Sequence, residues 1–252
     1  MYDLCVALPG IRKANWNRLY ESIITSIGDY TFQLILCSPE SELPEELKEK
    51  ENVKLITDFG SPSRAQQIAC LNADSEYITW AADDGWFLPN KLKECLDQLK
   101  DSKADKKAVA AFYTEDNRAG LADYSCNYHE PVRSQHYPDS YVIYNCAIVQ
   151  TDYFLSIGGF DCQFEVLPMA FTDYGVRSQR DGVETIVFTQ PIFECTHTPG
   201  TTGDHAPIHY AQLDHDQPLY GMIYSDPHCV YRVKIDINNW KNSPERWTRR
   251  FG

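Results

Sequence analysis

The stretch SEYITWAADDGWFLPNKL, residues 75–92, leads a run of apolar and β-branched residues straight into two adjacent carboxylates, Asp83 and Asp84. Asp-Asp-Gly is good turn material, because Asp hydrogen-bonds its own backbone and Gly accepts positive φ. Carboxylates are also the ligands that hold Mg²⁺ or Mn²⁺ beside substrate phosphates. The stretch therefore predicts a buried strand that ends either in a plain turn or in half of a cation site.

The rest of the first hundred residues alternates apolar strand-like runs with amphipathic helical patterns. The expected strands are 3–8, 32–37, 53–57 and 76–81. The expected helices are 14–28, 61–73 (opened by Ser61 and Pro62) and 88–100, and an acidic piece at 40–51 is expected to pass from loop into helix. This alternation indicates an α/β fold with a mainly parallel sheet. Ligands bind such sheets at the carboxyl ends of the strands, and Asp83 and Asp84 lie at one of these ends.

Beyond residue 100 the pattern loosens. Strands are expected at 107–114 and 140–150, separated by a polar, Tyr-rich loop at 114–139 that is long enough to be functional. A short helix is expected to be capped by Thr151 and stopped by two glycines. A helix over 170–182, with Asp173 near its start, and a strand at 184–189 follow. The residues from 196 onward match no clear pattern.

The composition limits the class of protein. The formal net charge of −13 over 252 residues opposes binding to phosphate backbones, so no nucleic-acid partner is expected. No run approaches the roughly 20 apolar residues of a membrane span, and the N-terminus lacks the pattern of a secretion signal. Nine scattered cysteines, several in apolar segments, favour a reduced protein in a cytoplasmic location.

Four stretches occur in an order and spacing typical of one family: VALPGIR (6–12), GSPSRAQQIACLNADSEYITWAADD (60–84), FLPNKL (87–92) and IGGFDCQFEVLPMAFTDYGVRSQRDG (157–182). Together they resemble the GT-A-fold glycosyltransferases, and are most similar to the inverting family two. The resemblance implies a GT-A α/β domain over 1–200 with a mixed, mainly parallel central sheet. Its nucleotide-sugar-binding half would be 1–100 and its acceptor half 101–200. Residues 201–252 would form an extension that packs on the site or closes it.

The implied activity is transfer of a sugar from a nucleotide-diphosphate donor to an acceptor hydroxyl, with inversion and with Mn²⁺ or Mg²⁺. By resemblance Asp84 and His197 hold the metal, and Asp173 is the base that deprotonates the acceptor. The donor-binding residues implied are Pro9, Arg12, Ser38, Gly60, Arg64, Asp83 and Asp84. Three of these roles have ordinary alternatives: an exposed helix arginine for Arg64, a helix N-terminal carboxylate for Asp173, and a lone histidine that binds no ligand for His197.

The chain departs from the family at several points, and these leave other functions open. Cys37-Ser38-Pro39 replaces the Asp that usually contacts the nucleobase, so Ser38 or Glu40 would substitute for it. Thr172-Asp173 replaces the usual Glu-Asp pair. A catalytically silent module that binds glycans or nucleotide sugars is therefore a second hypothesis. A metal-dependent hydrolase that uses the His-rich segment is a third.

Two C-terminal features complete the expectations. The spacing of Cys195, His197, His205 and His209 does not match structural zinc sites. The tail NNWKNSPERWTRRFG (238–252) mixes aromatic and basic residues, which suits contact with a membrane surface or a partner. The alternative is that its tryptophans pack back on the domain.

Overall fold

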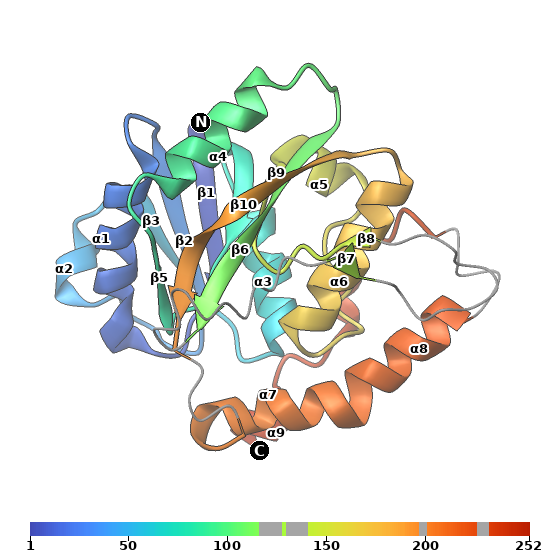
Figure 1. Cartoon of the computed structure of the whole chain (residues 1–252). Coiled ribbons are helices and arrows are strands. Elements are labelled where there is room, and N and C mark those ends of the chain that lie inside the picture. Colours follow the sequence, from blue (N-terminus) through green and yellow to red (C-terminus); the bar gives the residue numbers. More distant parts are fainter. Residues whose placement is uncertain (116–127, 130–140, 197–200, 226–231) are drawn as a thin grey trace.

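The computed structural model describes residues 1–115, 128–129, 141–196, 201–225 and 232–252. Its centre is one eight-stranded sheet with helices on both faces (Figure 1). The strand order is β3-β2-β1-β4-β9-β6-β10-β5. The strands are β1 (Tyr2–Pro9), β2 (Phe32–Ser38), β3 (Val53–Thr57), β4 (Ser75–Trp80), β5 (Gly85–Phe87), β6 (Lys107–Glu115), β9 (Ala147–Gln150) and β10 (Glu184–Cys195).

The sheet is mixed and mainly parallel, as predicted. Strands β3, β2, β1 and β4 run parallel, and β6 runs parallel to β10. Strand β9 pairs antiparallel with both β4 and β6, and β5 pairs antiparallel with β10. A separate pair joins β7 (Tyr128–His129) and β8 (Tyr141–Val142).

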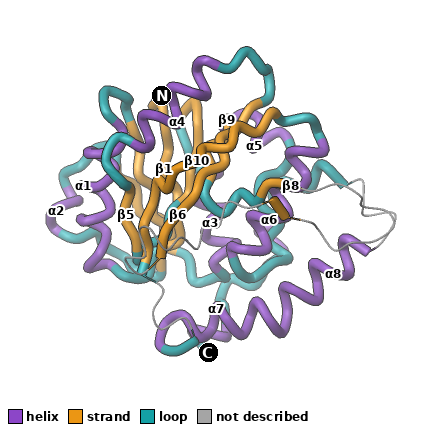
Figure 2. Tube along the Cα trace, in the orientation of Figure 1, coloured by secondary structure: helices purple, strands orange, loops and turns teal. Residues whose placement is uncertain are grey.

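The helices divide between the two faces of the sheet because neighbouring residues of a strand point to opposite sides (Figure 2). On β1, Leu4, Val6 and Leu8 pack with α1 (Trp16–Ile27) and α4 (Lys91–Asp101). Cys5 and Ala7 pack on the other face with α3 (Pro62–Leu71), α5 (Thr151–Ser156) and α6 (Leu167–Arg180). A strand that is apolar at every position is what burial on both faces requires.

The shorter helices lie at the periphery and in the C-terminal part. They are α2 (Glu45–Lys48), α7 (Ala206–Ala211), α8 (Gln217–Ser225) and α9 (Thr248–Phe251), with 3₁₀ turns at Lys13–Asn15, Gly203–His205 and Asn239–Asn242. A π-helical turn at Gln212–Asp216 joins α7 to α8. Among the described residues, no helix has the length and apolar character needed to cross a membrane.

Three local predictions are wrong. The expected strand at 140–150 is broken into β8 and β9, because the chain between them turns its carbonyls at Tyr144 and Asn145 toward the indole Nε1 of Trp80. Thr151 is the first helical residue and not the cap, which is Gln150. Asp173 does not start a helix: α6 begins six residues earlier, at Leu167, so Asp173 lies in its middle. Most of the predicted loop 114–139 falls outside the described residues.

Candidate functional site

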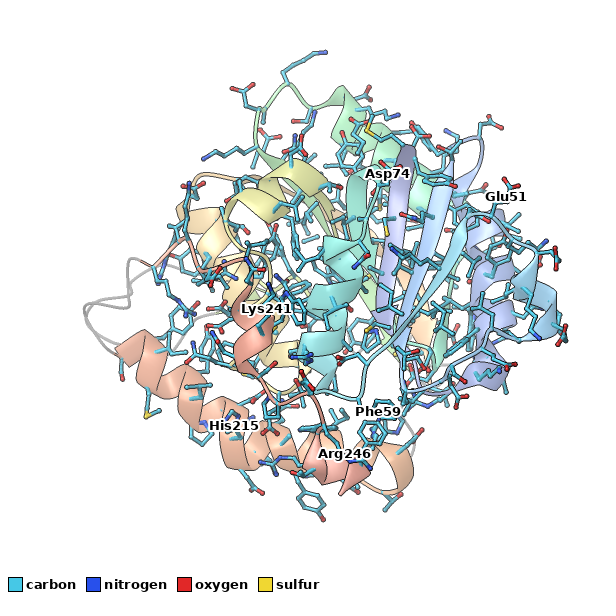
Figure 3. All side chains as sticks on the ribbon, turned by 180° about the vertical axis from the view of Figure 1, so that it is seen from behind. Glu51, Phe59, Asp74, His215, Lys241 and Arg246 are labelled. Atoms are coloured by element: carbon cyan, nitrogen blue, oxygen red, sulfur yellow. The ribbon has the colours of Figure 1, made fainter. Side chains whose placement is uncertain are left out.

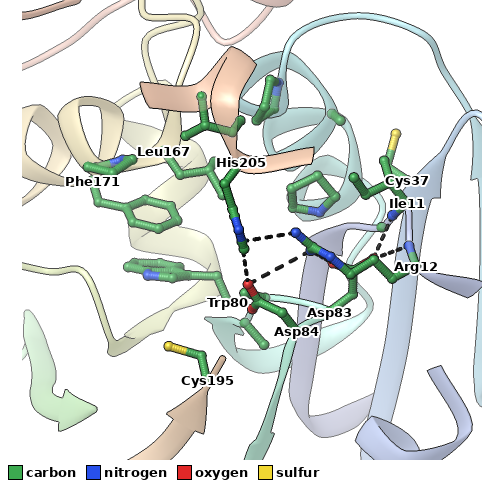
Figure 4. Close-up of a pocket in the computed structure, with 18 of the residues that line it drawn as sticks. Ile11, Arg12, Cys37, Trp80, Asp83, Asp84, Leu167, Phe171, Cys195 and His205 are labelled. Carbon is green, nitrogen blue, oxygen red and sulfur yellow. Dashed lines mark hydrogen bonds and ion pairs between the residues drawn. The ribbon is translucent and has the colours of Figure 1, made fainter. Parts of the chain in front are cut away.

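The turn that follows β4 brings the two adjacent carboxylates to the edge of the sheet where β1 and β4 end (Figure 4). The backbone N–H of Gly85 donates to the carbonyl of Ala82 at 3.3 Å, so the chain does turn there. Gly85 is needed because β10 passes close by: a Cβ would lie 2.2 Å from a ring carbon of Phe193. The turn and the convergence of the carboxylates are therefore parts of one arrangement.

Asp83 fixes the loop that follows β1. Its Oδ2 accepts hydrogen bonds from the backbone N–H groups of Ile11, at 2.6 Å, and Arg12, at 2.5 Å. Its Oδ1 accepts from Nη1 of Arg12 at 2.5 Å. Hydrogen bonds between ionised partners are the strongest in proteins. Asp83 therefore acts as a support that sets the position of the Arg12 guanidinium.

Arg12 stands at the centre of the site. Its Nε donates to Oδ2 of Asp204 at 2.7 Å, and its Nη1 lies 3.8 Å from Oδ2 of Asp84. Burial alone would lower the pKa of Arg12, but the charges of Asp83 and Asp84 raise it above its usual value. Arg12 therefore supplies a permanent positive charge inside the pocket.

His205 completes this group from a distant part of the chain. Its Nε2 lies 3.1 Å from Oδ2 of Asp84 and 3.1 Å from Nη2 of Arg12. Protonated on Nε2, the ring donates to Asp84; protonated on Nδ1 alone, it accepts from Arg12. Arg12, Asp83, Asp84 and His205 are called the pocket cluster below.

The pocket beside this cluster encloses about 240 Å³, a little below the usual range for small-molecule sites. One wall comes from the ends of β1 and β2 and the start of α3, and includes Pro9, Pro39 and Gly60. The opposite wall is aromatic, with Trp80 and Phe171 stacked at a centroid distance of 5.0 Å. The C-terminal segment forms the third side through Trp247, Arg250 and Phe251.

The structure brings five of the predicted donor-binding residues to this pocket: Pro9, Arg12, Gly60, Asp83 and Asp84. Ser38 and Arg64 do not line it. The hydroxyl of Ser38 is buried and accepts from the N–H of Glu40 at 3.0 Å, which is a local turn contact. His197, the predicted second metal ligand, lies outside the described residues.

Arg64 is neither exposed nor directed into the pocket. Only 5 % of its surface is accessible, and its Nε donates to Oδ1 of Asp58 at 3.0 Å. Its Nη1 donates to the carbonyls of Trp240 and Ser243 at 2.7 and 3.1 Å. Arg64 thus holds the C-terminal segment on the domain.

Asp173, the predicted base, is fully buried in α6 and does not line the pocket. Its Oδ2 accepts from Nε of Arg177 at 2.7 Å, and its Oδ1 from Nη2 of Arg232 at 2.6 Å and the hydroxyl of Tyr224 at 2.7 Å. Burial would raise the pKa of Asp173, but the two arginines, helped by these hydrogen bonds, lower it. These four residues are called the buried cluster below. A carboxylate held in this way is a weak proton acceptor.

Two side chains of the pocket cluster, those of Asp84 and His205, could bind a divalent cation. In the parts of the chain that the structure describes, no three His, Cys, Asp or Glu side chains converge as a metal cage would. Asp84 and His205 lie together, and Mg²⁺ often takes one or two carboxylates and completes its shell with substrate phosphates and water. The arrangement fits a metal that depends on bound phosphate and does not fit a cage made by protein alone.

Sequence analysis expected residues 201–252 to pack on the site or close it, but it did not name the residues that would reach the pocket. Arg250, Trp247 and Phe251 reach the pocket, and His205 was considered only as one of several possible zinc ligands. The signal available in advance was the mixture of aromatic and basic residues in the tail. Its tryptophans pack inward: Trp247 is 4 % exposed and contacts Val166 and Ala211.

The sequence matches no protein-family model and no curated protein. The structure, however, is similar to crystal structures of Staphylococcus aureus TarS, a glycosyltransferase of GT-A-like fold. The complex of TarS residues 1–349 with UDP-GlcNAc gives a TM-score of 0.59 at 13 % identity, over 81 % of this chain and 60 % of that one. The complex with UDP gives 0.56 at 13 % identity, over 77 % and 60 %. The present chain thus spans about 60 % of these TarS chains, and it has the GT-A fold.

Proposed function

We propose that the protein transfers a sugar from a nucleoside-diphosphate sugar to an acceptor hydroxyl, in the manner of the inverting family-two enzymes. The observation that carries the proposal is the pocket cluster. At the carboxyl ends of parallel strands in a GT-A fold, two carboxylates and an arginine line one cavity. Ligands of open α/β sheets bind at this edge. TarS, which shares the fold, binds UDP and UDP-GlcNAc.

The proposed roles follow from the positions of the side chains. Arg12 would neutralise the charge that grows on the diphosphate as it leaves, because a fixed positive group in a partly buried site stabilises developing charge strongly. Asp83 keeps Arg12 in place by accepting two hydrogen bonds from Arg12 and one from the backbone N–H of Ile11. The wall with Pro9, Pro39 and Gly60 would receive the nucleoside, and the aromatic wall with Trp80 and Phe171 the acceptor.

Mn²⁺ or Mg²⁺ would be held by Asp84 and His205 together with the donor phosphates. Such an ion supplies further positive charge against the diphosphate. Asp84 and His205 orient each other through their contact at 3.1 Å, so either substitution would disturb both. The base role of Asp173 stays a prediction, and it requires this carboxylate to leave Arg177 and Arg232.

The experiment is a donor-turnover assay with UDP-GlcNAc first and then UDP-, GDP-, CDP- and dTDP-hexoses, each with Mn²⁺ and with EDTA. Release of the nucleoside diphosphate is followed without acceptor, because glycosyltransferases hydrolyse their donor slowly. We expect release from one donor class, and loss of that release in Asp84→Asn. Binding of a donor with no release in any condition would contradict transfer.

A second candidate is a silent module that binds nucleotide sugars or glycans. It is favoured by the engagement of Asp173 in the buried cluster, since no other carboxylate was predicted as base. The same assay separates the two functions: a silent module gives donor binding by calorimetry without release of nucleoside diphosphate.

A further inference from the structure

Two arginines from opposite ends of the chain line the pocket. Arg12 follows β1, and Arg250 belongs to α9, two positions before the last residue of the sequence. The tail that carries Arg250 was expected to contact a membrane surface or a partner, or to pack its tryptophans back on the domain. The reason that Arg250 reaches the pocket lies in how its segment is anchored.

The C-terminal segment is fixed along the edge of the domain. The backbone N–H of Trp247 donates to the carbonyl of Phe59 at 2.8 Å, and Phe59 also forms a parallel bridge with Arg246 (Figure 3). The ring of Phe251 meets that of Phe59 edge to face at 5.7 Å. The indole Nε1 of Trp247 donates to Oε2 of Glu165 at 3.0 Å. These contacts hold α9 at the rim of the pocket on both sides of Arg250.

Arg250 differs from its neighbour Arg249 in whether acidic side chains form ion pairs with it. Nε of Arg249 lies 2.6 Å from Oε2 of Glu165, and its Nη1 lies 4.0 Å from Asp214. Arg250 forms no ion pair within the described parts of the chain; its Nη2 donates to the backbone carbonyl of Asp204. Arg249 does not line the pocket, whereas Arg250 does. The two side chains therefore make a matched pair that differs in access to the site.

Asp204 connects the two pocket arginines. Its carboxylate accepts from Nε of Arg12 at 2.7 Å, and its carbonyl accepts from Arg250. The side chain of Asp204 is 45 % exposed, so an incoming anion can displace it from Arg12 without leaving a buried charge unpaired. Burial lowers the pKa of Arg250 below its usual value, and the nearby charge of Arg12 lowers it further. The two guanidinium groups thus repel each other, the charges of Asp204 and Asp83 offset this in part, and an anion bound between the arginines would relieve it further.

We propose that Arg12 and Arg250 form a clamp, in which both guanidinium groups bind the diphosphate of the donor. The loop after β1 supplies Arg12, and the C-terminal segment supplies Arg250. The planar guanidinium presents paired N–H donors that match phosphate oxygens. The clamp supplies charge from the protein alone, alongside any metal at Asp84. It rests on the proposed function, because a diphosphate is the anion that a nucleotide-sugar donor brings to this position.

The test compares nucleotide affinity in the full-length wild-type chain, Arg250→Gln, Arg250→Lys and the matched control Arg249→Gln. Calorimetry measures UDP, GDP, CDP, dTDP and ADP, and the monophosphate and nucleoside of whichever diphosphate binds. Each titration is run with Mn²⁺ and with EDTA. The melting temperature without ligand reports whether each variant is folded.

We expect Arg250→Gln to weaken binding of the diphosphate about 10- to 100-fold, because hydrogen bonds to charged groups contribute that much. Binding of the nucleoside should change less than threefold, and Arg249→Gln should match the wild type. The diphosphate affinity of Arg250→Lys should lie between those of the wild type and Arg250→Gln, since lysine keeps the positive charge but lacks the paired N–H donors of the guanidinium. The loss should persist in EDTA.

Equal diphosphate affinity in Arg250→Gln and Arg249→Gln would overturn the clamp while leaving the donor site intact. An equal loss for nucleoside and diphosphate would overturn it too, because Arg250 would then act on the shape of the pocket. Failure of the wild-type chain to bind any of the five diphosphates would overturn the proposed function and the clamp together. If Arg250→Gln does not fold, Arg250→Lys gives the decisive comparison with Arg249→Gln.

Discussion

The pocket cluster and the buried cluster use the same chemistry in opposite surroundings. Each joins aspartates to arginine at hydrogen-bond distance, 2.5 Å between Arg12 and Asp83 and 2.7 Å between Arg177 and Asp173. The side chain of Arg12 is 22 % exposed and lines a cavity. The side chains of Asp173 and Arg177 are 0 % exposed. An arginine at a cavity can exchange partners with a ligand, whereas a sealed one holds helices together.

This difference shows why residue type and order along the chain identify a site incompletely. Asp83, Asp84 and Asp173 were all predicted as functional from the same resemblance. The structure gives the first two access to a pocket and gives the third two arginine partners and a tyrosine. Four predictions test this difference and the packing of the turn that carries Asp83 and Asp84. They are given in order, from the largest expected effect to the smallest.

The largest effect is expected on stability, from Asp173→Asn. Removing one partner of a buried ion pair leaves the other charge uncompensated, which costs about 3–5 kcal/mol. Urea unfolding followed by circular dichroism measures the loss. The exposed pair of Lys93 with Asp97 is the control, because Asp97→Asn should cost less than about 1 kcal/mol. A stable Asp173→Asn protein without turnover would instead support the base role.

The next effect is expected on turnover, from Asp84→Asn. Loss of one preorganised electrostatic group in an active site lowers the rate about 10²- to 10³-fold. The fold should persist, since Asn keeps the shape of Asp and can still hydrogen-bond to His205. Release of nucleoside diphosphate from the active donor measures the change. Wild-type turnover in this variant would remove Asp84 from the site.

Gly85→Ala should have a smaller effect, about 1–3 kcal/mol of stability, because the new methyl group must displace packed neighbours. A Cβ there would lie 2.2 Å from the ring of Phe193 and 2.4 Å from the carbonyl of Glu194. Gly221 in α8 is the matched control, since nothing lies within 4 Å of its Cβ position. Gly221→Ala should stabilise the chain, as alanine favours helix. Equal effects of the two substitutions would mean that the turn after β4 is not tightly packed.

The smallest effect concerns pH. The pKa of Asp173 is lowered in the folded state relative to about 3.9 in the unfolded chain. The stability it contributes is therefore complete above about pH 4 and is lost as pH falls through the lower, folded pKa. Urea midpoints between pH 5 and pH 2 should fall less steeply in Asp173→Asn than in the wild type. Parallel curves would show that this carboxylate does not titrate differently on folding.

The sequence predicted the first half of the fold well because its signals are local. Strand and helix periodicity, and the helix start at Ser61, where the side chain accepts from the N–H of Arg64, depend on neighbouring residues. Asp83 and Asp84 could be found because they follow a strand whose end must lie at the ligand edge of a parallel sheet. The prediction of one strand at 140–150 failed because Trp80, far away in the chain, binds the carbonyls that interrupt it.

The other half of the site could not be predicted because it depends on contacts between distant residues. His205 lies 193 positions from the arginine that it contacts, and no periodicity reports that distance. Arg64 had two expected roles, and two of its actual partners, the carbonyls of Trp240 and Ser243, lie 176 and 179 positions away. Asp173 was predicted in the right helix but at its start instead of its middle, so its burial and its arginine partners were not foreseen.

The central claim is that the pocket cluster binds a nucleoside diphosphate. The most direct measurement is the melting temperature of the wild-type chain and Asp84→Asn with UDP, GDP, CDP, dTDP and ADP, each with and without Mn²⁺. A ligand that binds only the folded state must raise the melting temperature. We predict a rise with one diphosphate that Mn²⁺ increases in the wild type, and loss of this Mn²⁺-dependent increase in Asp84→Asn. No rise with any of the five, or an equal Mn²⁺-dependent increase in both proteins, would contradict the claim.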